Sequence, residues 1–259
     1  MLRDASITFE DVTKRFGDAP PALERVSLSV QPKEFLAVVG ASGSGKTTLL
    51  RLINRLLDPS SGKLQIGGAD LQSLDPIALR RRIGYVFQEV GLFPHMTVAE
   101  NIAITPQLLR WEPERMAARV DELLELVRLD PAYRARFPHQ LSGGERQRVG
   151  VARALAARPD IVLMDEPFAA LDPLTRDALA QDYRRLHDQL ALTTVMITHD
   201  MLEALGLADR IAVLRSGSLI AEGAPSLLML HEHAYVRQLM QAPRKVAERV
   251  NALLAAKER

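Results

Sequence analysis

The stretch that decides the fold is Gly40-Ala41-Ser42-Gly43-Ser44-Gly45-Lys46-Thr47-Thr48. The apolar run 34–39 before it has the character of a strand, and the apolar residues at helical spacing in 49–57 after it predict a helix. Strand, glycine-rich loop and helix form the context in which the pattern G-x-x-x-x-G-K-[ST] binds phosphate. The alternative is a flexible glycine turn between two core elements. The strand before the loop and the helix after it make this alternative the weaker one.

This loop has the chemistry of a phosphate site. Glycines let backbone N–H groups curl around an anion with no Cβ in the way, and the N-terminus of the following helix adds partial positive charge. We expect Lys46 to reach the β- and γ-phosphates of a nucleotide and the Thr47 hydroxyl to hold Mg²⁺. The nucleotide-binding residues predicted in the loop are Gly40, Ser42, Gly43, Ser44, Gly45, Lys46, Thr47 and Thr48.

The bulk composition limits the kinds of partner. The chain has 259 residues, enough for one large or two modest domains with a real core. Lys and Arg number 33 against 32 for Asp and Glu, so the net charge of +1 gives no argument for nucleic acid or an anionic membrane as the main partner. The absence of cysteine excludes disulfides, thiolate zinc sites and cysteine nucleophiles.

Neither a membrane-spanning nor a secreted form is predicted. No apolar run is long enough to cross a bilayer, and residues 1–6 lack the apolar region of a signal peptide. We therefore expect a soluble protein in the cytoplasm, which would reach a membrane only by docking on another protein.

Apolar periodicity in the rest of the chain predicts an α/β fold with a P-loop NTPase core, meaning a mostly parallel sheet with flanking helices. Alternation within residues 6–39 predicts an N-terminal antiparallel β subdomain. Residues 98–157 contain no strand-like run, which predicts an inserted helical subdomain. Residues 211–221 predict a closing hairpin, and 225–259 are expected to be helical, with an apolar stripe at Val246, Val250, Leu253 and Leu254.

Polar residues follow three of the predicted core strands. Gln88, Asp165 with Glu166, and His199 each come directly after a short apolar run. Polar residues at such strand ends in an α/β protein point to the ligand crevice. We expect Asp165 to hold Mg²⁺ through its water shell, Glu166 to polarise a water for attack on the γ-phosphate, and His199 to contact that phosphate.

Simpler interpretations of several residues stay open. Asp165 and Glu166 could form a surface turn, and His199 could be a packed or exposed residue without a ligand. Phe16 could stack on a nucleotide base or be an ordinary core or turn-edge residue, and the sequence does not decide between them. The basic run 80–82 is more simply the solvated end of a helix than a nucleic-acid patch.

The run Leu141-Ser142-Gly143-Gly144-Glu145-Arg146-Gln147-Arg148 predicts the start of a helix. Ser142 and Glu145 have the spacing of a capping box, and the two glycines between them would leave N–H groups exposed for a second phosphate contact. A plain helix cap is the alternative.

The order of these parts resembles the ATP-binding cassette (ABC) family: P-loop, Gln88, an LSGG-type signature, an acidic strand end and then His199. The resemblance covers about residues 6–225 and implies an ATP-binding domain over 1–225, with the helical subdomain at about 98–157. A C-terminal helical extension over 226–259 would follow. One departure is Glu145, where the family more often has Gln, and from it we expect a change in affinity without loss of activity.

The resemblance implies ATP and Mg²⁺ as ligands and assigns further roles. Phe16 falls where the family stacks adenine, and Gln88 falls on the loop that touches Mg²⁺ and the attacking water. Asp172 falls on the D-loop, which crosses between the subunits of a head-to-tail dimer holding two ATP molecules. The implied catalytic residues are Glu166, His199, Gln88 and Lys46; the implied Mg²⁺ ligands are Thr47, Gln88 and Asp165; and the residues implied to contact the γ-phosphate of the other subunit are Ser142, Gly143 and Gly144.

The leading functional hypothesis is the ATP-hydrolysing subunit of a membrane importer, peripheral on the cytoplasmic face of the plasma membrane. Its expected partners are permease subunits, a sister ATPase subunit in a homodimer, and a substrate-binding protein through the complex. Nucleic acid is not an expected partner. A lipid-trafficking cassette and a soluble cassette acting on DNA or ribosomes are the other classes, and the second usually has long coiled coils or two cassettes, which this sequence lacks.

The cargo is suggested only by resemblance. The stretches 51–56, 83–103 and 107–111 look most like those of importers for quaternary-amine osmoprotectants such as glycine betaine, choline or carnitine. A polar amino acid or another small solute is the alternative cargo. Many such cassettes carry a long C-terminal pair of regulatory domains, for which the sequence to Arg259 has no room, so regulation by ionic strength through such domains is not expected.

Overall fold

The computed structural model describes residues 5–257, except for the side chains of 245–247 and 249–257. Its first sheet is antiparallel, with the strand order β2-β1-β4-β5. Ile7 pairs with Val30 on one side and with Ile66 on the other, so the alternating apolar residues gather on one face. This confirms the antiparallel β subdomain that alternation predicted. The strands are β1 (Ile7–Lys14), β2 (Leu23–Val30), β4 (Ser61–Ile66) and β5 (Ala69–Asp70).

The second sheet contains six strands in the order β10-β9-β3-β8-β7-β6. All neighbouring pairs in it are parallel except β9 with β10, which close the sheet as an antiparallel hairpin. Parallel strands bring their carboxyl ends to one edge, which is where the P-loop and the polar strand-end residues lie. The strands are β3 (Phe35–Val39), β6 (Ile83–Val86), β7 (Ile161–Asp165), β8 (Thr193–Thr198), β9 (Arg210–Arg215) and β10 (Ser218–Gly223).

Strand β3 is buried along its whole length because it separates two hydrophobic cores. Phe35, Ala37 and Val39 face the core shared with the helices, and Leu36 and Val38 face the core shared with the antiparallel sheet. The alternation of side chains along a strand explains this division. The loop that follows β3 is therefore held between two packed layers.

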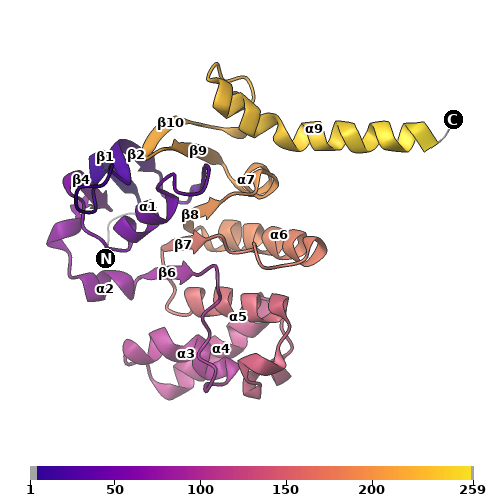
Figure 1. Ribbon diagram of the computed structural model, residues 1–259. Helices are drawn as coiled ribbons and strands as arrows, with labels where there is room; N and C mark the ends of the chain where they lie inside the picture. Colours follow the sequence, from indigo (N-terminus) through magenta and orange to yellow (C-terminus); the bar gives the residue numbers. More distant parts are fainter. Residues whose placement is uncertain (1–4, 258–259) are drawn as a thin grey trace.

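Helices cover the sheets, and Figure 1 shows α3, α4 and α5 grouped at one end of the molecule. The range 98–157 contains helices and no strand, as predicted. The helices are α1 (Lys46–Ile53), α2 (Pro76–Arg80), α3 (Val98–Leu108), α4 (Pro113–Leu126), α5 (Gly143–Leu155), α6 (Pro173–Leu190), α7 (Met201–Leu207), α8 (Pro225–Leu228) and α9 (Ala234–Lys257), with 3₁₀ turns η1 (Leu71–Ser73), η2 (Pro131–Ala135) and η3 (Pro138–Gln140).

Two helix predictions were wrong in their bounds. Helix α1 begins at Lys46 and ends at Ile53, whereas the periodicity predicted 49–57, because Arg55 has a left-handed backbone with φ 47° that the helix cannot continue through. The predicted helical segment 225–259 is broken at 229–233 into α8 and α9. The stripe Val246, Val250, Leu253 and Leu254 lies outside the described side chains.

Helix α9 projects away from the rest of the molecule in Figure 1. Its first turns are anchored, because Val236 and Met240 are buried in the core shared with the helices. Within the described residues, no helix combines the length and the apolar character needed to cross a bilayer.

Candidate functional site

A cavity of about 430 Å³ lies at the P-loop, at the carboxyl end of β3. Besides the loop, it is bordered by Ala22, which immediately precedes β2, and by Glu166 and His199, which follow the ends of β7 and β8. The loop residues that line it are Ser42, Gly43, Gly45, Lys46, Thr47 and Thr48. Most of the predicted phosphate-binding residues therefore surround one space together with two strand-end residues.

The loop needs glycine at two positions. Gly45 immediately precedes α1 with φ 103°, and a Cβ there would lie 2.4 Å from the carbonyl oxygen of Ala22. At Gly40 a Cβ would lie 2.1 Å from the carbonyl oxygen of Leu214. Neither Gly40 nor Ser44 lines the cavity, but the Ser44 hydroxyl is buried without a hydrogen-bond partner among the described residues. A buried unpaired hydroxyl is costly, which fits a loop whose polar groups are completed by a ligand.

Lys46 is held inside the curl of the loop. Its Nζ donates to the carbonyl oxygens of Gly40 at 2.9 Å and Ala41 at 3.0 Å. Burial lowers the pKa of Lys46, while the nearby carboxylates of Glu166 and Asp165 act in the opposite direction. The ammonium is thus positioned at the cavity wall, with neutral carbonyls as its hydrogen-bond acceptors.

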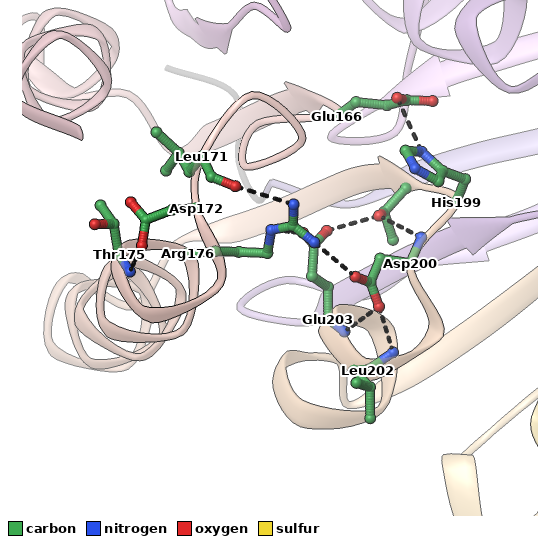
Figure 2. Close-up of polar contacts among 10 residues, drawn as sticks. Glu166, Leu171, Asp172, Thr175, Arg176, His199, Asp200, Leu202 and Glu203 are labelled. Carbon is green, nitrogen blue, oxygen red and sulfur yellow. Dashed lines mark hydrogen bonds and ion pairs between the residues drawn. The ribbon is translucent and has the colours of Figure 1, made fainter. Parts of the chain in front are cut away.

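Three of the predicted catalytic side chains meet at Glu166. Its Oε2 lies 3.0 Å from Nδ1 of His199 (Figure 2) and 3.5 Å from Nε2 of Gln88. The Glu166 backbone is left-handed, with φ 45°, and its N–H donates to the carbonyl oxygen of Ile197 at 2.9 Å. A strained backbone with its carboxylate at a cavity edge is typical of functional positions.

Asp165 lies at the end of β7 and has a partner that the sequence did not suggest. The hydroxyl of Tyr85, on β6, is hydrogen-bonded to its carboxylate. Burial raises the pKa of Asp165, and the adjacent Glu166 carboxylate raises it further, whereas Arg51 and Lys46 oppose the shift. Burial also raises the pKa of Tyr85, so the phenol stays protonated and donates to the carboxylate.

The LSGG-type run forms the predicted capping box at the start of α5. The Glu145 N–H donates to the Ser142 hydroxyl at 3.3 Å, and the Ser142 N–H donates to Glu145 Oε2 at 2.6 Å. The Tyr133 hydroxyl donates to the other carboxylate oxygen at 2.5 Å, and these bonds lower the pKa of Glu145. The Glu145 carboxylate, at a position where the family more often has Gln, therefore accepts one hydrogen bond from the Ser142 N–H and one from the Tyr133 hydroxyl.

Besides Gly40, Ser44 and Gln88, five further predicted nucleotide contacts do not border the cavity. Asp172 caps α6 by accepting from the Thr175 N–H at 3.1 Å. Phe16 is 49% exposed, and its ring lies 5.2 Å from Nζ of Lys14. The remaining three, Ser142, Gly143 and Gly144, lie at the start of α5. A Cβ added to Gly144 would come within 2.6 Å of Thr175 Cγ2, so this glycine lies close to α6.

Tyr235, on α9, is a loop contact that sequence reasoning missed. Its hydroxyl accepts a hydrogen bond from the Ala41 N–H at 3.2 Å, and Arg215 lies over its ring. The residues are 194 positions apart, so no local pattern could have indicated the contact.

Comparison with known proteins gives one consistent result. The family model for ABC transporters matches residues 23–169. Choline transport ATP-binding protein OpuBA of Bacillus subtilis is 44% identical over 255 residues, covering 96% of this chain and 67% of that protein. Glycine betaine/carnitine/choline transport ATP-binding protein OpuCA of the same organism is 48% identical over 223 residues, covering 86% of this chain and 59% of that protein.

A solved structure of an ATP-binding cassette also resembles this chain. The cassette MJ0796, in a dimeric post-hydrolysis state bound to ADP and Pi, is 35% identical with a TM-score of 0.75, and the match covers 84% of this chain and 98% of that one. The present chain spans between 59% and 67% of the two curated relatives named above. With the family model matching more than half of its residues, the chain belongs to the ABC transporter family.

Proposed function

We propose that this chain is the ATP-hydrolysing subunit of an ABC importer for quaternary-amine osmoprotectants such as glycine betaine, choline or carnitine. The observation that carries the enzymatic part is the Glu166 carboxylate, which lies at the edge of the P-loop cavity within 3.0 Å of His199. A carboxylate at this place can accept a proton from a water that attacks the γ-phosphate.

The P-loop, Lys46 and His199 would have separate tasks in this reaction. The P-loop N–H groups and Lys46 would bind the β- and γ-phosphates of the substrate, ATP. Lys46 would exchange its two carbonyl acceptors for phosphate oxygens, which are stronger acceptors because they are charged. His199 would contact the γ-phosphate and, through its bond to Glu166, orient the base.

Mg²⁺ fits the donor atoms at the site. Oxygen ligands are what Mg²⁺ prefers, and the Thr47 hydroxyl, the Asp165 carboxylate and the Gln88 amide supply them. The described residues contain no group of three or more His, Cys, Asp or Glu that could hold a metal ion by themselves. Mg²⁺ in nucleotide sites is usually bound by one or two protein groups together with the substrate phosphates, and the donor atoms named above would suffice for that. When bound, the ion would neutralise charge on the β- and γ-phosphates.

A dimer would complete the site. Ser142, Gly143, Gly144 and Asp172 do not border the cavity of their own chain, but the first three lie at an exposed helix N-terminus suited to an anion. We propose that these residues face the γ-phosphate held by a second copy. The dimeric, ADP-bound and Pi-bound form of a 35% identical cassette supports this arrangement.

A groove of about 460 Å³ beside Gln88 is the proposed contact with the permease. Arg153 of α5 fixes its rim by donating to the carbonyl oxygens of Val90 and Gly91 at 2.5 and 2.7 Å. Aromatic and basic side chains line it, among them Tyr85, Phe87, Phe93, Arg80 and Arg81. A permease docked here would hold the chain peripherally at the cytoplasmic face of the membrane.

The cargo assignment is tested on the intact membrane complex, purified through a tag on this chain and reconstituted with its binding protein. We expect the ATPase rate to rise with glycine betaine, choline or carnitine. Stimulation by an amino acid but by none of these three would contradict the cargo and leave the ATPase assignment standing. No ATP hydrolysis by the complex under any condition would contradict both.

A further inference from the structure

Arg176, on the first turns of α6, bonds to two functional loops at once (Figure 2). One terminal nitrogen of its guanidinium donates to the carbonyl oxygen of Leu171 at 3.1 Å. The other terminal nitrogen donates to Oδ2 of Asp200, also at 3.1 Å. Leu171 precedes the D-loop acid Asp172, and Asp200 follows His199. A single planar side chain therefore joins the D-loop backbone to the turn that carries the histidine.

The two residues beside His199 are themselves fixed. Asp200 caps α7, with Oδ1 accepting from the Leu202 N–H at 2.8 Å, and its own N–H donates to the Thr198 hydroxyl at 3.0 Å. The Thr198 hydroxyl donates to Glu203 Oε2 at 2.6 Å. His199 thus lies between two anchored neighbours, and its own polar contact is the 3.0 Å approach to Glu166.

The guanidinium is partly buried and incompletely paired. Its side chain is 27% exposed, and its Nε is buried without a hydrogen bond among the described residues. Nε lies 3.9 Å from Oε1 of Glu203, which is too far for a hydrogen bond. Fork-shaped donation to two acceptors at fixed spacing is a property of arginine that lysine does not share. The two terminal contacts are therefore the ones that define the position of this side chain.

We propose that Arg176 is a positioning residue for His199, which ties the place of the histidine to the place of the D-loop. This inference rests on the proposed function, because it assumes that His199 acts with Glu166 on ATP. A displacement of the Leu171 carbonyl would move the guanidinium, then Asp200, and with it the turn that presents His199. The arginine would thereby make correct alignment of the base conditional on a correctly placed D-loop.

The test compares Arg176→Gln with Arg184→Gln in the full chain. Arg184 is a matched control, since it lies on the same helix, is 28% exposed and bonds to α7 at the Leu207 carbonyl, but touches neither loop. For Arg176→Gln we expect kcat to fall about tenfold with KM for ATP within about twofold, since small misplacements of catalytic groups are costly. For Arg184→Gln we expect both constants unchanged.

Two further variants separate positioning from general stability. Arg176→Lys can reach one acceptor but not both, so we expect an intermediate kcat; this variant also decides the matter if Arg176→Gln does not fold. Adding Arg176→Gln to a His199→Ala background should cause little additional loss of single-turnover rate. Equal behaviour of the two arginine variants, a native kcat for Arg176→Lys, or a full loss in the His199→Ala background would each overturn the inference.

A failure of the positioning role of Arg176 can be told apart from a failure of the proposed function. If His199→Ala hydrolyses ATP at the native rate, the assignment of His199 is wrong and the proposed function fails first. If His199→Ala is impaired while Arg176→Gln matches its control, only the positioning role is lost.

Discussion

Nδ1 of His199 lies 3.0 Å from Oε2 of Glu166, although the residues are 33 positions apart and come from the ends of different strands. Strands β7 and β8 are parallel neighbours, so their carboxyl ends lie side by side. The same carboxylate oxygen also receives the 3.5 Å contact from Gln88 at the end of β6. A residue from each of three adjacent strands thus converges on one carboxylate beside the phosphate loop.

Replacing Glu166 by Gln should separate ATP binding from hydrolysis. The amide keeps the size of the side chain but cannot act as a base, so we expect the hydrolysis rate to fall by about 10²-fold or more while ATP still binds. Size-exclusion chromatography with ATP and Mg²⁺ should then show an accumulated dimer. Hydrolysis at the native rate would show that Glu166 is not the base.

Replacing Lys46 by Ala should abolish tight ATP binding. Its ammonium is the cation that donates into the loop, and charge-assisted hydrogen bonds contribute about 1.5–3 kcal/mol each, or about 10- to 150-fold in affinity. Equilibrium binding of a fluorescent ATP analogue measures the change. Lys63→Ala, at an exposed position of β4, is the control and should bind normally. Unchanged affinity of the Lys46 variant would remove this residue from the phosphate site.

Two glycine replacements should change the free energy of unfolding in opposite directions. Gly45→Ala places a Cβ 2.4 Å from the Ala22 carbonyl oxygen on a backbone with φ 103°, so we expect a loss of about 1–3 kcal/mol in unfolding free energy. Gly206→Ala, inside α7 with nothing within 4 Å of the added Cβ, should be neutral or stabilising by up to about 1 kcal/mol. Urea unfolding measures both, and equal effects would contradict the loop geometry.

Glu203 should give the stability curve a defined pH dependence. Burial raises the pKa of this carboxyl, and neighbouring Asp200 adds to the shift, while the Thr198 hydrogen bond and Arg176 oppose it. Because the unfolded chain releases this proton first, the stabilisation is full below the unfolded pKa, about 4.3, and is lost as the pH rises through the folded pKa.

Gln does not titrate, so Glu203→Gln should gain stability relative to the native chain as the pH rises from the unfolded pKa, about 4.3, through the raised folded pKa. Urea unfolding at several pH values measures this difference, with Glu24→Gln at an exposed position of β2 as the control. A difference that stays constant with pH would contradict the prediction.

Phe93→Asp should uncouple transport from ATP hydrolysis. Phe93 is 43% exposed on the rim of the proposed permease groove, so a charge there disfavours an apolar contact without filling the core. Leu92 packs against the core, which makes it a poorer site for this substitution. We expect the isolated subunit to hydrolyse ATP normally while uptake by the reconstituted complex falls at least about tenfold, as for loss of an interface anchor. Leu230→Asp, 84% exposed, is the control, and full uptake with Phe93→Asp would move the contact elsewhere.

The sequence predicted the parts of the site that rest on local pattern. The P-loop, the capping box of Ser142 and Glu145 and the polar strand ends are all set within a few residues, so spacing and periodicity could locate them. The antiparallel sheet and the helical insertion followed in the same way. The assigned roles of the site residues and the domain boundaries remain predictions.

The sequence could not predict features that depend on contacts between distant segments. The Tyr85 hydroxyl contacts Asp165 only because β6 and β7 are neighbouring strands. Arg176 contacts Asp200 only because the first turn of α6 lies beside the start of α7. Helix α1 ends early because the backbone of Arg55 is left-handed. Arginine rarely adopts this conformation, so nothing in the sequence was a reason to predict it here.

The hydrogen bond from the Ala41 N–H to the Tyr235 hydroxyl affects how the chain can be divided for expression. A fragment that stops at residue 225 would agree with the predicted domain boundary but would lack this support of the phosphate loop. It would also uncover the core surface that Val236 and Met240 occupy. Fragments prepared for crystallography or for fusion to a reporter should therefore extend beyond Met240, because the first turns of α9 belong physically to the nucleotide-binding unit.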